Sequence, residues 1–505
     1  MADVPSIPKW LEGRGILVTG ATGFVGKVLV AKLLSACPRV GNIYLLVREK
    51  KGAKPNSRLH ALIQQEPFRK IRENHPERLE RLVVISGDTT HEGLGLSSED
   101  KNRVTNEVSV IFHMAANVRF DLPLRVAVAL NTKGTANLIA VAKQLPKLKS
   151  LIHVSTAYCH CGQTILEEKA YPPAILPEDL IPAIDAMSDE TLQKIRGKIL
   201  GDQPNTYALS KCLSEDLMVN SGLPVGIARP SIVVASWKEP VPGYVDNLNG
   251  PTGLVVGAGK GVIRSMHCAG NYLADIIPCD IVANATIALS WKVGLENPCK
   301  PIFVNVCEGG RNPITWEYAL NEGRKHVFAN PFSGPLWYPG GRITSSAFLH
   351  LLAVIFLHMI PAYFLDTVIA LCGNKPFLVK VQARVNAGLT LLQYYTTKKW
   401  VFLTGGLEEL QSRLCPDDRC AFFMDTREIC WSDYLLSYVL GIRKFCLKDD
   451  PSTLPRARQV FKYLYIADRF LRLIFLTFVA WFIYSWISPA NTTATSIIEM
   501  KNLYD

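Results

Sequence analysis

Residues 13–49 contain the feature that most restricts the possible fold, a glycine-rich turn between an apolar stretch and a helix-like stretch. The segment reads GRGILVTGATGFVGKVLVAKLLSACPRVGNIYLLVRE. ILVTG is typical of a buried strand, KVLVAKLL repeats apolar residues at helical spacing, and NIYLLVR predicts a second strand. In this order they indicate a βαβ unit whose glycines let backbone N–H groups contact a dinucleotide pyrophosphate. A tight turn without a ligand is the alternative.

The turn and the end of the second strand supply the first predicted cofactor contacts. Those in the turn are Gly20, Thr22, Gly23, Phe24, Val25 and Gly26. An acidic residue at the end of the second strand would select NAD by binding the ribose 2′-hydroxyl. The chain instead has Arg48 there, with Lys50 and Lys51 close by. Because a guanidinium suits a 2′-phosphate, we expect NADPH instead of NADH, with solvated loop charges as the alternative.

Strand-like and helix-like segments continue to alternate as far as residue 236. Strands are predicted in 81–88, 108–116, 148–159 and 224–236, and helices in 129–145 and from residue 205. This alternation predicts an α/β fold with a Rossmann-type parallel sheet, which binds its ligand at the carboxyl ends of the strands. Further predicted cofactor contacts are Asp88, Ala115, Asn131 and Pro230. Asn131 could organise water near Lys211 or cap a helix.

The segment NTYALSKCLSE, residues 205–215, places Tyr207 and Lys211 one helical turn apart. Such a pair is common by chance, but here it follows a predicted strand that ends in Ser155 and Thr156. The pKa of a free tyrosine is about 10, and a neighbouring ammonium stabilises the phenolate and lowers that pKa. We therefore predict that Tyr207 and Lys211 are catalytic and also contact the cofactor. Thr156 would hold the substrate oxygen, with Ser155 as the alternative.

Several longer motifs point to one family. They are TGATGFVGKVL, FHMAANVRFD, HVSTAYC, NTYALSK, RPSIV, GYVDNLNGPTGLVVGAGKGVIRSM, PAYFLDTVIALCGNKPFLVKV and YYTTKKWVF. Between about residue 10 and residue 447 the chain resembles the eukaryotic fatty acyl-CoA reductases of the extended short-chain dehydrogenase/reductase superfamily. The resemblance implies that two NADPH reduce a long-chain acyl-CoA to a primary alcohol through an aldehyde, with Tyr207 as proton donor. A sterol or aldehyde-forming membrane reductase and an inactive lipid- or nucleotide-binding scaffold are the alternatives.

The domain prediction combines this resemblance with the change in pattern after residue 330. The predicted units are a lead (1–12), an NADPH-binding reductase domain (13–335), a smaller helical domain (345–447), a linker (448–469), a transmembrane anchor (470–488) and a tail (489–505). Residues 345–373 are apolar but contain His350, His358, Pro361 and Asp366. We expect them to line an acyl tunnel or to press into the membrane surface, with a buried helical pair as the alternative.

Residues 470–488, FLRLIFLTFVAWFIYSWIS, are almost continuously apolar. As a helix they would be somewhat shorter than about 30 Å, enough for a thin bilayer, although a buried core helix is possible. Basic residues precede the segment, at Arg456, Arg458, Lys462, Arg469 and Arg472. Positive flanks stay cytosolic, so we predict a single-pass protein of the endoplasmic reticulum membrane with a cytosolic catalytic domain, or else of the peroxisomal membrane.

Charge and cysteine content restrict the partners. The net charge of +11 suits phosphorylated cofactors, coenzyme A esters or an anionic membrane, and we exclude nucleic acid because no basic run interleaved with aromatics stands out. Lys260 and Arg264 could meet coenzyme A phosphates or belong to a solvated loop. The thirteen cysteines are scattered and indicate a reducing compartment. No metal site is predicted, because Cys159-His160-Cys161 lacks a second ligand pair. Oligomeric state and acyl-chain preference are not predicted.

Overall fold

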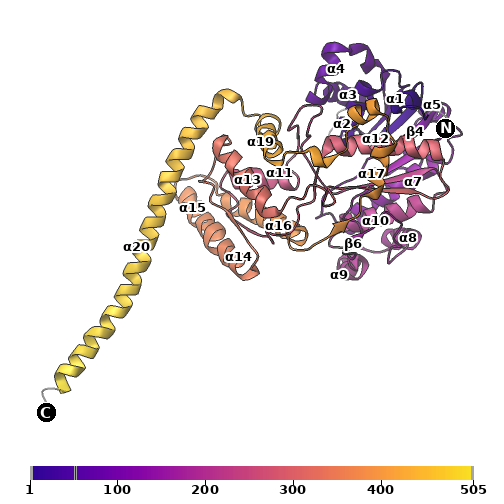
Figure 1. Ribbon diagram of the computed structural model, residues 1–505. Helices are drawn as coiled ribbons and strands as arrows, with labels where there is room; N and C mark the ends of the chain where they lie inside the picture. Colours follow the sequence, from indigo (N-terminus) through magenta and orange to yellow (C-terminus); the bar gives the residue numbers. More distant parts are fainter. Residues whose placement is uncertain (1–3, 50–51, 53, 502–505) are drawn as a thin grey trace.

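The computed structural model describes residues 4–49, 52 and 54–501, with side chains as far as Trp486 (Figure 1). Its centre is a parallel seven-stranded sheet with the order β11-β7-β5-β4-β1-β2-β3. The strands are β1 (Gly15–Thr19), β2 (Ile43–Val47), β3 (Leu82–Ser86), β4 (Val108–His113), β5 (Ser150–Val154), β7 (Val225–Pro230) and β11 (Ile302–Val306). The predicted Rossmann-type sheet is therefore confirmed. The order reverses between β1 and β4, and ligands bind at such switch points in open parallel sheets.

Helices cover both faces of the sheet (Figure 1). Successive strand residues point to opposite faces, so Ile16 and Val18 pack with α2 (Phe24–Ala36) and α12 (Cys279–Glu296), whereas Leu17 belongs to the core on the other face. That second core includes residues of α5 (Ser98–Glu107), α7 (Gly134–Ala142) and α10 (Thr206–Val219). Burial on both faces explains why the strands are continuously apolar instead of alternating.

Two predicted elements differ in detail. The helix expected over 129–145 begins earlier, as α6 (Leu124–Ala127) and a π-helical turn, η4 (Val128–Lys133), before α7. The strand expected over 224–236 is divided, because the chain leaves the main sheet after Pro230, where β7 ends. Its continuation, β8 (Ile232–Val234), pairs instead with β10 (Ile276–Pro278).

Further short helices complete the first part of the chain. They are α1 (Ile7–Leu11), α3 (Pro55–Ile63), η1 (Glu66–Phe68), α4 (Arg69–Asn74), η2 (Pro76–Arg81), η3 (Glu92–Gly95), α8 (Pro177–Ala186), α9 (Asp189–Leu200) and α11 (Pro251–Gly259).

The second half is helical, as predicted. Its elements are α13 (Trp316–Ala329), α14 (Ala347–Ala353), η5 (Val354–Met359), α15 (Ile360–Leu371), α16 (Leu378–Thr396), α17 (Gly405–Arg413), α18 (Pro416–Ala421), η6 (Thr426–Glu428), α19 (Trp431–Gly441) and η7 (Ile442–Cys446). Two small sheets tie this half to the first: β12 (Arg342–Thr344) pairs with β9 (Ser265–His267), and β13 (Val401–Phe402) with β6 (Ile165–Leu166).

The helical run α14–η5–α15 exposes its apolar side chains. By length and composition this run is long and apolar enough to cross a bilayer, and little of it is buried. Two of its polar residues, His358 and Asp366, are buried against the protein. His358 accepts a hydrogen bond from the Arg264 N–H (3.0 Å), and the Asp366 carboxylate accepts from the first N–H groups of α16. The alternative of an ordinary buried helical pair is therefore wrong.

The last helix, α20 (Leu454–Lys501), leaves the body of the protein and carries the predicted anchor (Figure 1). Residues 454–469, expected to be linker, are its first turns. They pack on the protein through Asp468, which accepts hydrogen bonds from Trp337 Nε1 (2.8 Å) and Arg264 Nη2 (3.1 Å). After Asp468 the large apolar side chains as far as Trp486 are exposed, which rules out a buried core helix.

Candidate active site

The glycine turn joins β1 to α2 at the switch point. Gly20 has φ +75°, a backbone conformation that residues with a side chain rarely adopt. A Cβ there would also lie only 2.6 Å from the Ala115 backbone nitrogen, so the position requires glycine. A Cβ at Gly26 would clash with the Gly20 carbonyl. Gly23 is the N-cap of α2 and gives its first N–H groups no side-chain partner. This positive, uncapped helix end suits a pyrophosphate.

Two arginines flank this turn where the adenosine ribose is expected. Arg48 Nη1 lies 3.5 Å from Asp88 Oδ2, and half of the Arg48 side chain is exposed. Arg58, from α3, donates through Nη2 to Thr22 Oγ1 (3.1 Å) and through Nη1 to the Arg48 carbonyl. Although burial opposes it, hydrogen bonds from Thr90 and the charge of Arg48 lower the pKa of Asp88.

The sequence interpretation missed Arg58. No local pattern identifies it, because its position depends on α3 folding back over the turn. Lys50 and Lys51, which were expected near Arg48, lie outside the described residues.

Asn131 connects the end of β4 to α10. Its Oδ1 accepts from the Asn117 N–H (2.8 Å), and its Nδ2 donates to Ser210 Oγ (2.9 Å), the residue before Lys211. Because Asn131 lies inside η4, it does not cap a helix. At the same edge, Thr19 Oγ1 accepts from the Ala115 N–H (3.2 Å) and the Pro230 carbonyl accepts from the Ala157 N–H (2.9 Å). The predicted cofactor residues after β1, β4 and β7 thus lie along one edge of the sheet.

Lys211, predicted to be catalytic, is held at the carboxyl end of β5. Lys211 Nζ donates to the Val154 carbonyl (2.6 Å) and lies 3.5 Å from His153 Nε2. Burial lowers the pKa of Lys211 to about 8. Burial also raises the pKa of the Tyr207 phenol, so the lowered value expected from the sequence is wrong for this structure. The reason is that the Val154 carbonyl binds the ammonium group, and desolvation dominates at the phenol.

The two candidate hydroxyls after β5 have different surroundings. The Ser155 side chain is directed at Cys159, with Oγ 3.6 Å from Sγ. Thr156 Oγ1 accepts from the Tyr158 N–H (3.2 Å) and keeps its own hydrogen for another acceptor. Thr156 is therefore better suited to hold a substrate oxygen.

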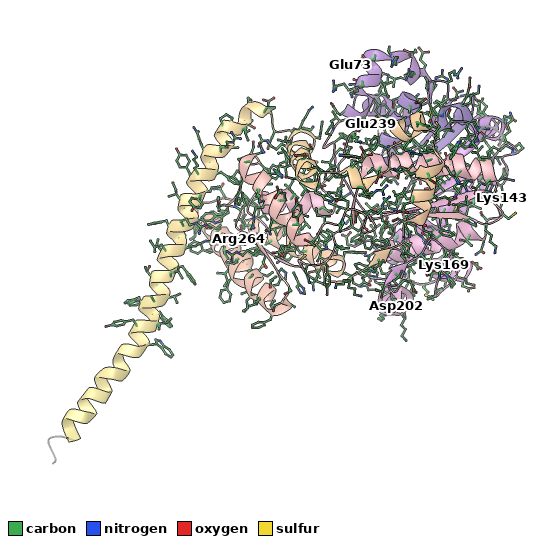
Figure 2. All side chains as sticks on the ribbon, viewed as in Figure 1. Glu73, Lys143, Lys169, Asp202, Glu239 and Arg264 are labelled. Carbon is green, nitrogen blue, oxygen red and sulfur yellow. The ribbon has the colours of Figure 1, made fainter. Side chains whose placement is uncertain are left out.

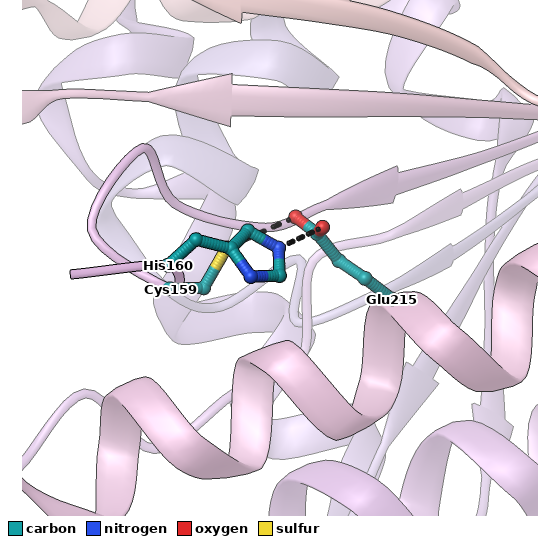
Figure 3. Close-up of side chains that lie close together, drawn as sticks. All are labelled: Cys159, His160 and Glu215. Carbon is teal, nitrogen blue, oxygen red and sulfur yellow. Dashed lines mark hydrogen bonds and ion pairs between the residues drawn. The ribbon is translucent and has the colours of Figure 1, made fainter. Parts of the chain in front are cut away.

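Behind these hydroxyls, Cys159, His160 and Glu215 form a buried cluster (Figure 3). Glu215 Oε2 lies 2.9 Å from His160 Nε2, and Cys159 Sγ lies 3.2 Å from Oε1. These donor types can bind a metal, but Arg229 already donates to both Glu215 oxygens (2.9 and 2.6 Å). Although burial opposes it, Arg229 and His160 hold the pKa of Glu215 well below its usual value. The cluster ties α10 to the loop after β5.

The helical half contributes an aromatic wall, which the sequence interpretation also missed. The Phe120 ring lies 5.7 Å from that of Tyr207 and 5.4 Å from that of Tyr395 in α16. Tyr395 Oη accepts a hydrogen bond from Asn205 Nδ2 (2.8 Å), and Asn205 also caps α10. The motif YYTTKKWVF contains Tyr395, but nothing in the sequence pattern indicates that the end of α16 contacts the start of α10.

A parallel sheet with an uncapped glycine turn at its switch point, and a partly buried tyrosine one helical turn before a buried lysine at the strand end that carries the Thr156 hydroxyl, defines a nicotinamide-dependent oxidoreductase of the short-chain dehydrogenase/reductase type. Models of the male sterility protein family match residues 18–286, the NAD-binding part, and residues 357–449. Mouse and human fatty acyl-CoA reductase 1 are 39% and 38% identical to this chain, each over 460 residues that cover 90% of this chain and 88% of the relative. Mouse fatty acyl-CoA reductase 2 is 36% identical over 455 residues, with the same coverage. The chain belongs to the fatty acyl-CoA reductase family.

Solved structures agree on the fold. The reductase domain of a nonribosomal peptide synthetase from Mycobacterium tuberculosis is 20% identical, with a TM-score of 0.57, and the match covers 87% of this chain and 93% of that domain. The terminal reductase domain of the myxalamid pathway is also 20% identical, with a TM-score of 0.55 and coverage of 85% and 90%.

Proposed function

We propose that this protein is an alcohol-forming fatty acyl-CoA reductase. It converts a long-chain acyl-CoA, two NADPH and two protons into a primary alcohol, coenzyme A and two NADP⁺, through a bound aldehyde. The observation that carries the proposal is the 38–39% identity to named fatty acyl-CoA reductases over 90% of the chain, together with Thr156, Tyr207 and Lys211 at one sheet edge.

The choice of NADPH over NADH rests on the two guanidinium groups beside the turn. Arg48 and Arg58 would bind a ribose 2′-phosphate, which NADH lacks. The close backbone packing at Gly20, Gly23 and Gly26 forms the tight turn, and the uncapped first N–H groups of α2 would bind the pyrophosphate. When bound, NADPH supplies the hydride for each reduction. Lys211 would donate to the nicotinamide ribose and so orient the ring.

The residues of the site suit both half-reactions. Thr156 donates a hydrogen bond to the carbonyl oxygen, where negative charge develops. Tyr207 is protonated at neutral pH, as a free tyrosine is, and burial raises its pKa further, so it can give that oxygen a proton. Addition of hydride to the thioester carbon and of this proton to its oxygen gives a hemithioacetal. The hemithioacetal then collapses to the aldehyde, and the sulfur leaves as the free thiol of coenzyme A. The same two residues act on the aldehyde oxygen in the second reduction.

NADPH consumption by detergent-solubilised protein with palmitoyl- and stearoyl-CoA tests the proposal, with products identified by gas chromatography. We expect primary alcohol at two NADPH per acyl-CoA. Tyr207→Phe should abolish product, whereas Tyr318→Phe, which changes an exposed tyrosine, should not. Aldehyde as the final product would indicate an aldehyde-forming reductase. NADPH binding without either product would leave a sterol reductase or an inactive scaffold.

The domain and membrane proposals follow the same reasoning. The two family matches support a reductase domain at 13–335 and a helical domain at 345–447. The exposed apolar side chains of α20 support a transmembrane anchor at 470–488, and the basic residues before it support a cytosolic catalytic domain. The short span fits the endoplasmic reticulum, with the peroxisomal membrane as the alternative.

A further inference from the structure

A cavity of about 450 Å³ opens beside the loop after β5, between the two halves of the chain. Its lining residues are Cys161, Gly162, Gln163, Thr164, Asp202, Tyr272, Tyr394, Thr397, Lys398, Lys399 and Trp400. They come from the loop after β5, the turn before α10, the loop between β9 and β10, and the last turn of α16 with the residues that follow it. This volume is in the range of small-molecule sites.

The cavity combines exposed cations with flat aromatic faces. Lys398 Nζ lies 3.9 Å from the centre of the Tyr394 ring, and Lys399 Nζ lies 4.7 Å from that of Tyr272. Neither ammonium group forms an ion pair with the part of the chain that the structure describes. The rings hold the two charges over the cavity without neutralising them. Such a surface suits a purine that carries several phosphates, and the Asp202 carboxylate can accept from an amino or hydroxyl group.

The wall of the cavity continues to the catalytic residues. The Trp400 ring lies 5.3 Å from that of Tyr158, whose N–H binds Thr156 Oγ1. On the other side, ring-to-ring steps of 5.4, 5.4 and 5.7 Å lead from Tyr394 through Tyr395 and Phe120 to Tyr207. The pantetheine arm of coenzyme A has the bond count of about four residues and extends about 14 Å, and the diphosphate lengthens it. A nucleotide in the cavity can therefore place a thioester at Tyr207.

We propose that this cavity binds the 3′-phosphoadenosine diphosphate part of the acyl-CoA substrate. Lys398 and Lys399 contact the phosphates, and Tyr394, Tyr272 and Trp400 offer faces for the adenine. The inference rests on the proposed function and assigns the nucleotide end of its substrate. Arg264, which the sequence offered for these phosphates, donates instead to Asp468 of α20.

A comparison of two substrates tests the assignment. Palmitoyl-CoA carries the nucleotide, and palmitaldehyde, the substrate of the second reduction, does not. In the double variant Lys398→Ser/Lys399→Ser we expect KM for palmitoyl-CoA to rise about tenfold or more, with kcat little changed and both constants for palmitaldehyde unchanged. Lys143→Ser, at an exposed lysine away from Asp202 (Figure 2), should change neither substrate.

Direct binding of a fragment of coenzyme A gives an independent measurement. With NADP⁺ saturating its own site, adenosine 3′,5′-bisphosphate should bind the wild-type protein and bind the double variant at least about tenfold more weakly. An unchanged KM for palmitoyl-CoA, or an equal rise for both substrates, would overturn the assignment. A wild-type protein that reduces neither substrate would contradict the proposed function, and fragment binding lost in the double variant would still support the cavity.

Discussion

Lys211 is a buried lysine whose pKa differs strongly from that of a free lysine. Burial lowers it to about 8, so the ammonium group is present below that pH and is lost above it. If the charge of Lys211 serves cofactor binding and proton transfer, as proposed, kcat/KM for NADPH should fall as the pH rises through about 8. A pH profile across the neutral and alkaline range measures this limb.

Lys211→Arg is the matched control for the pH profile. Arginine keeps its charge throughout the range, so the alkaline limb should disappear even where the variant is slower. A wild-type kcat/KM that stays constant or rises well above pH 8 would contradict the assigned role of the ammonium group.

Arg58 gives a second prediction at the scale of the residue. If its guanidinium binds the 2′-phosphate, Arg58→Ala should raise KM for NADPH about tenfold or more, because a charge-assisted hydrogen bond contributes about 1.5–3 kcal/mol, and should leave KM for NADH nearly unchanged. If Arg58 only holds Thr22 and the Arg48 carbonyl in place, its replacement should weaken the binding of NADPH and NADH equally. Arg103→Ala, on exposed α5, is the control.

At the scale of elements, the sequence predicted those strands, helices and residue pairs that depend on patterns between neighbouring residues. β1, α2 and β2 follow from apolar periodicity and the glycines, and the spacing of the proposed catalytic pair, Tyr207 and Lys211, follows from one helical turn of α10. Tyr395 and Arg58 were missed, because α16 and α3 return to the site from distant or unpatterned segments. The pKa of Tyr207 was predicted wrongly, since desolvation depends on the packing around the side chain.

The Glu215–Arg229 pair fixes α10 against the loop after β5. Both side chains are buried, so Glu215→Ala would leave a guanidinium without its counter-charge, a change that costs about 3–5 kcal/mol. We expect the unfolding temperature of the solubilised protein to fall by about 5 °C or more, with activity reduced because α10 carries Tyr207 and Lys211.

Asp216→Asn is the control for the buried pair. Asp216 is the next residue along α10 and is partly exposed, so its replacement should change stability by only about 0.5 kcal/mol. Equal unfolding temperatures for Glu215→Ala and the wild-type protein would show that the pair does not brace the helix.

For the whole molecule, the two helical segments that expose apolar side chains lie together. α20 runs past α14 and α15 before it leaves the body (Figure 1), and Arg264 binds both His358, through its N–H, and Asp468. In α14–η5–α15 the exposed residues include Phe348 (67%), Phe356 (60%) and Phe364 (68%). Exposed phenylalanines of this kind, on a helix beside the proposed membrane anchor, are typical of an interfacial segment.

This arrangement predicts two separable contributions to membrane binding. A chain that ends at Arg472 lacks the apolar part of α20 and should still float partly with phosphatidylcholine–phosphatidylserine vesicles, through the α14–α15 face. Adding Phe348→Ser, Phe356→Ser and Phe364→Ser to the shortened chain should abolish flotation, while the same substitutions in the full chain leave it anchored. Each phenylalanine that enters the apolar part of the bilayer contributes about 1.5–3 kcal/mol to membrane binding. Replacing all three should therefore remove most of the binding free energy of a reversible surface contact. Complete loss of flotation in the shortened chain alone would show that α20 is the sole membrane contact.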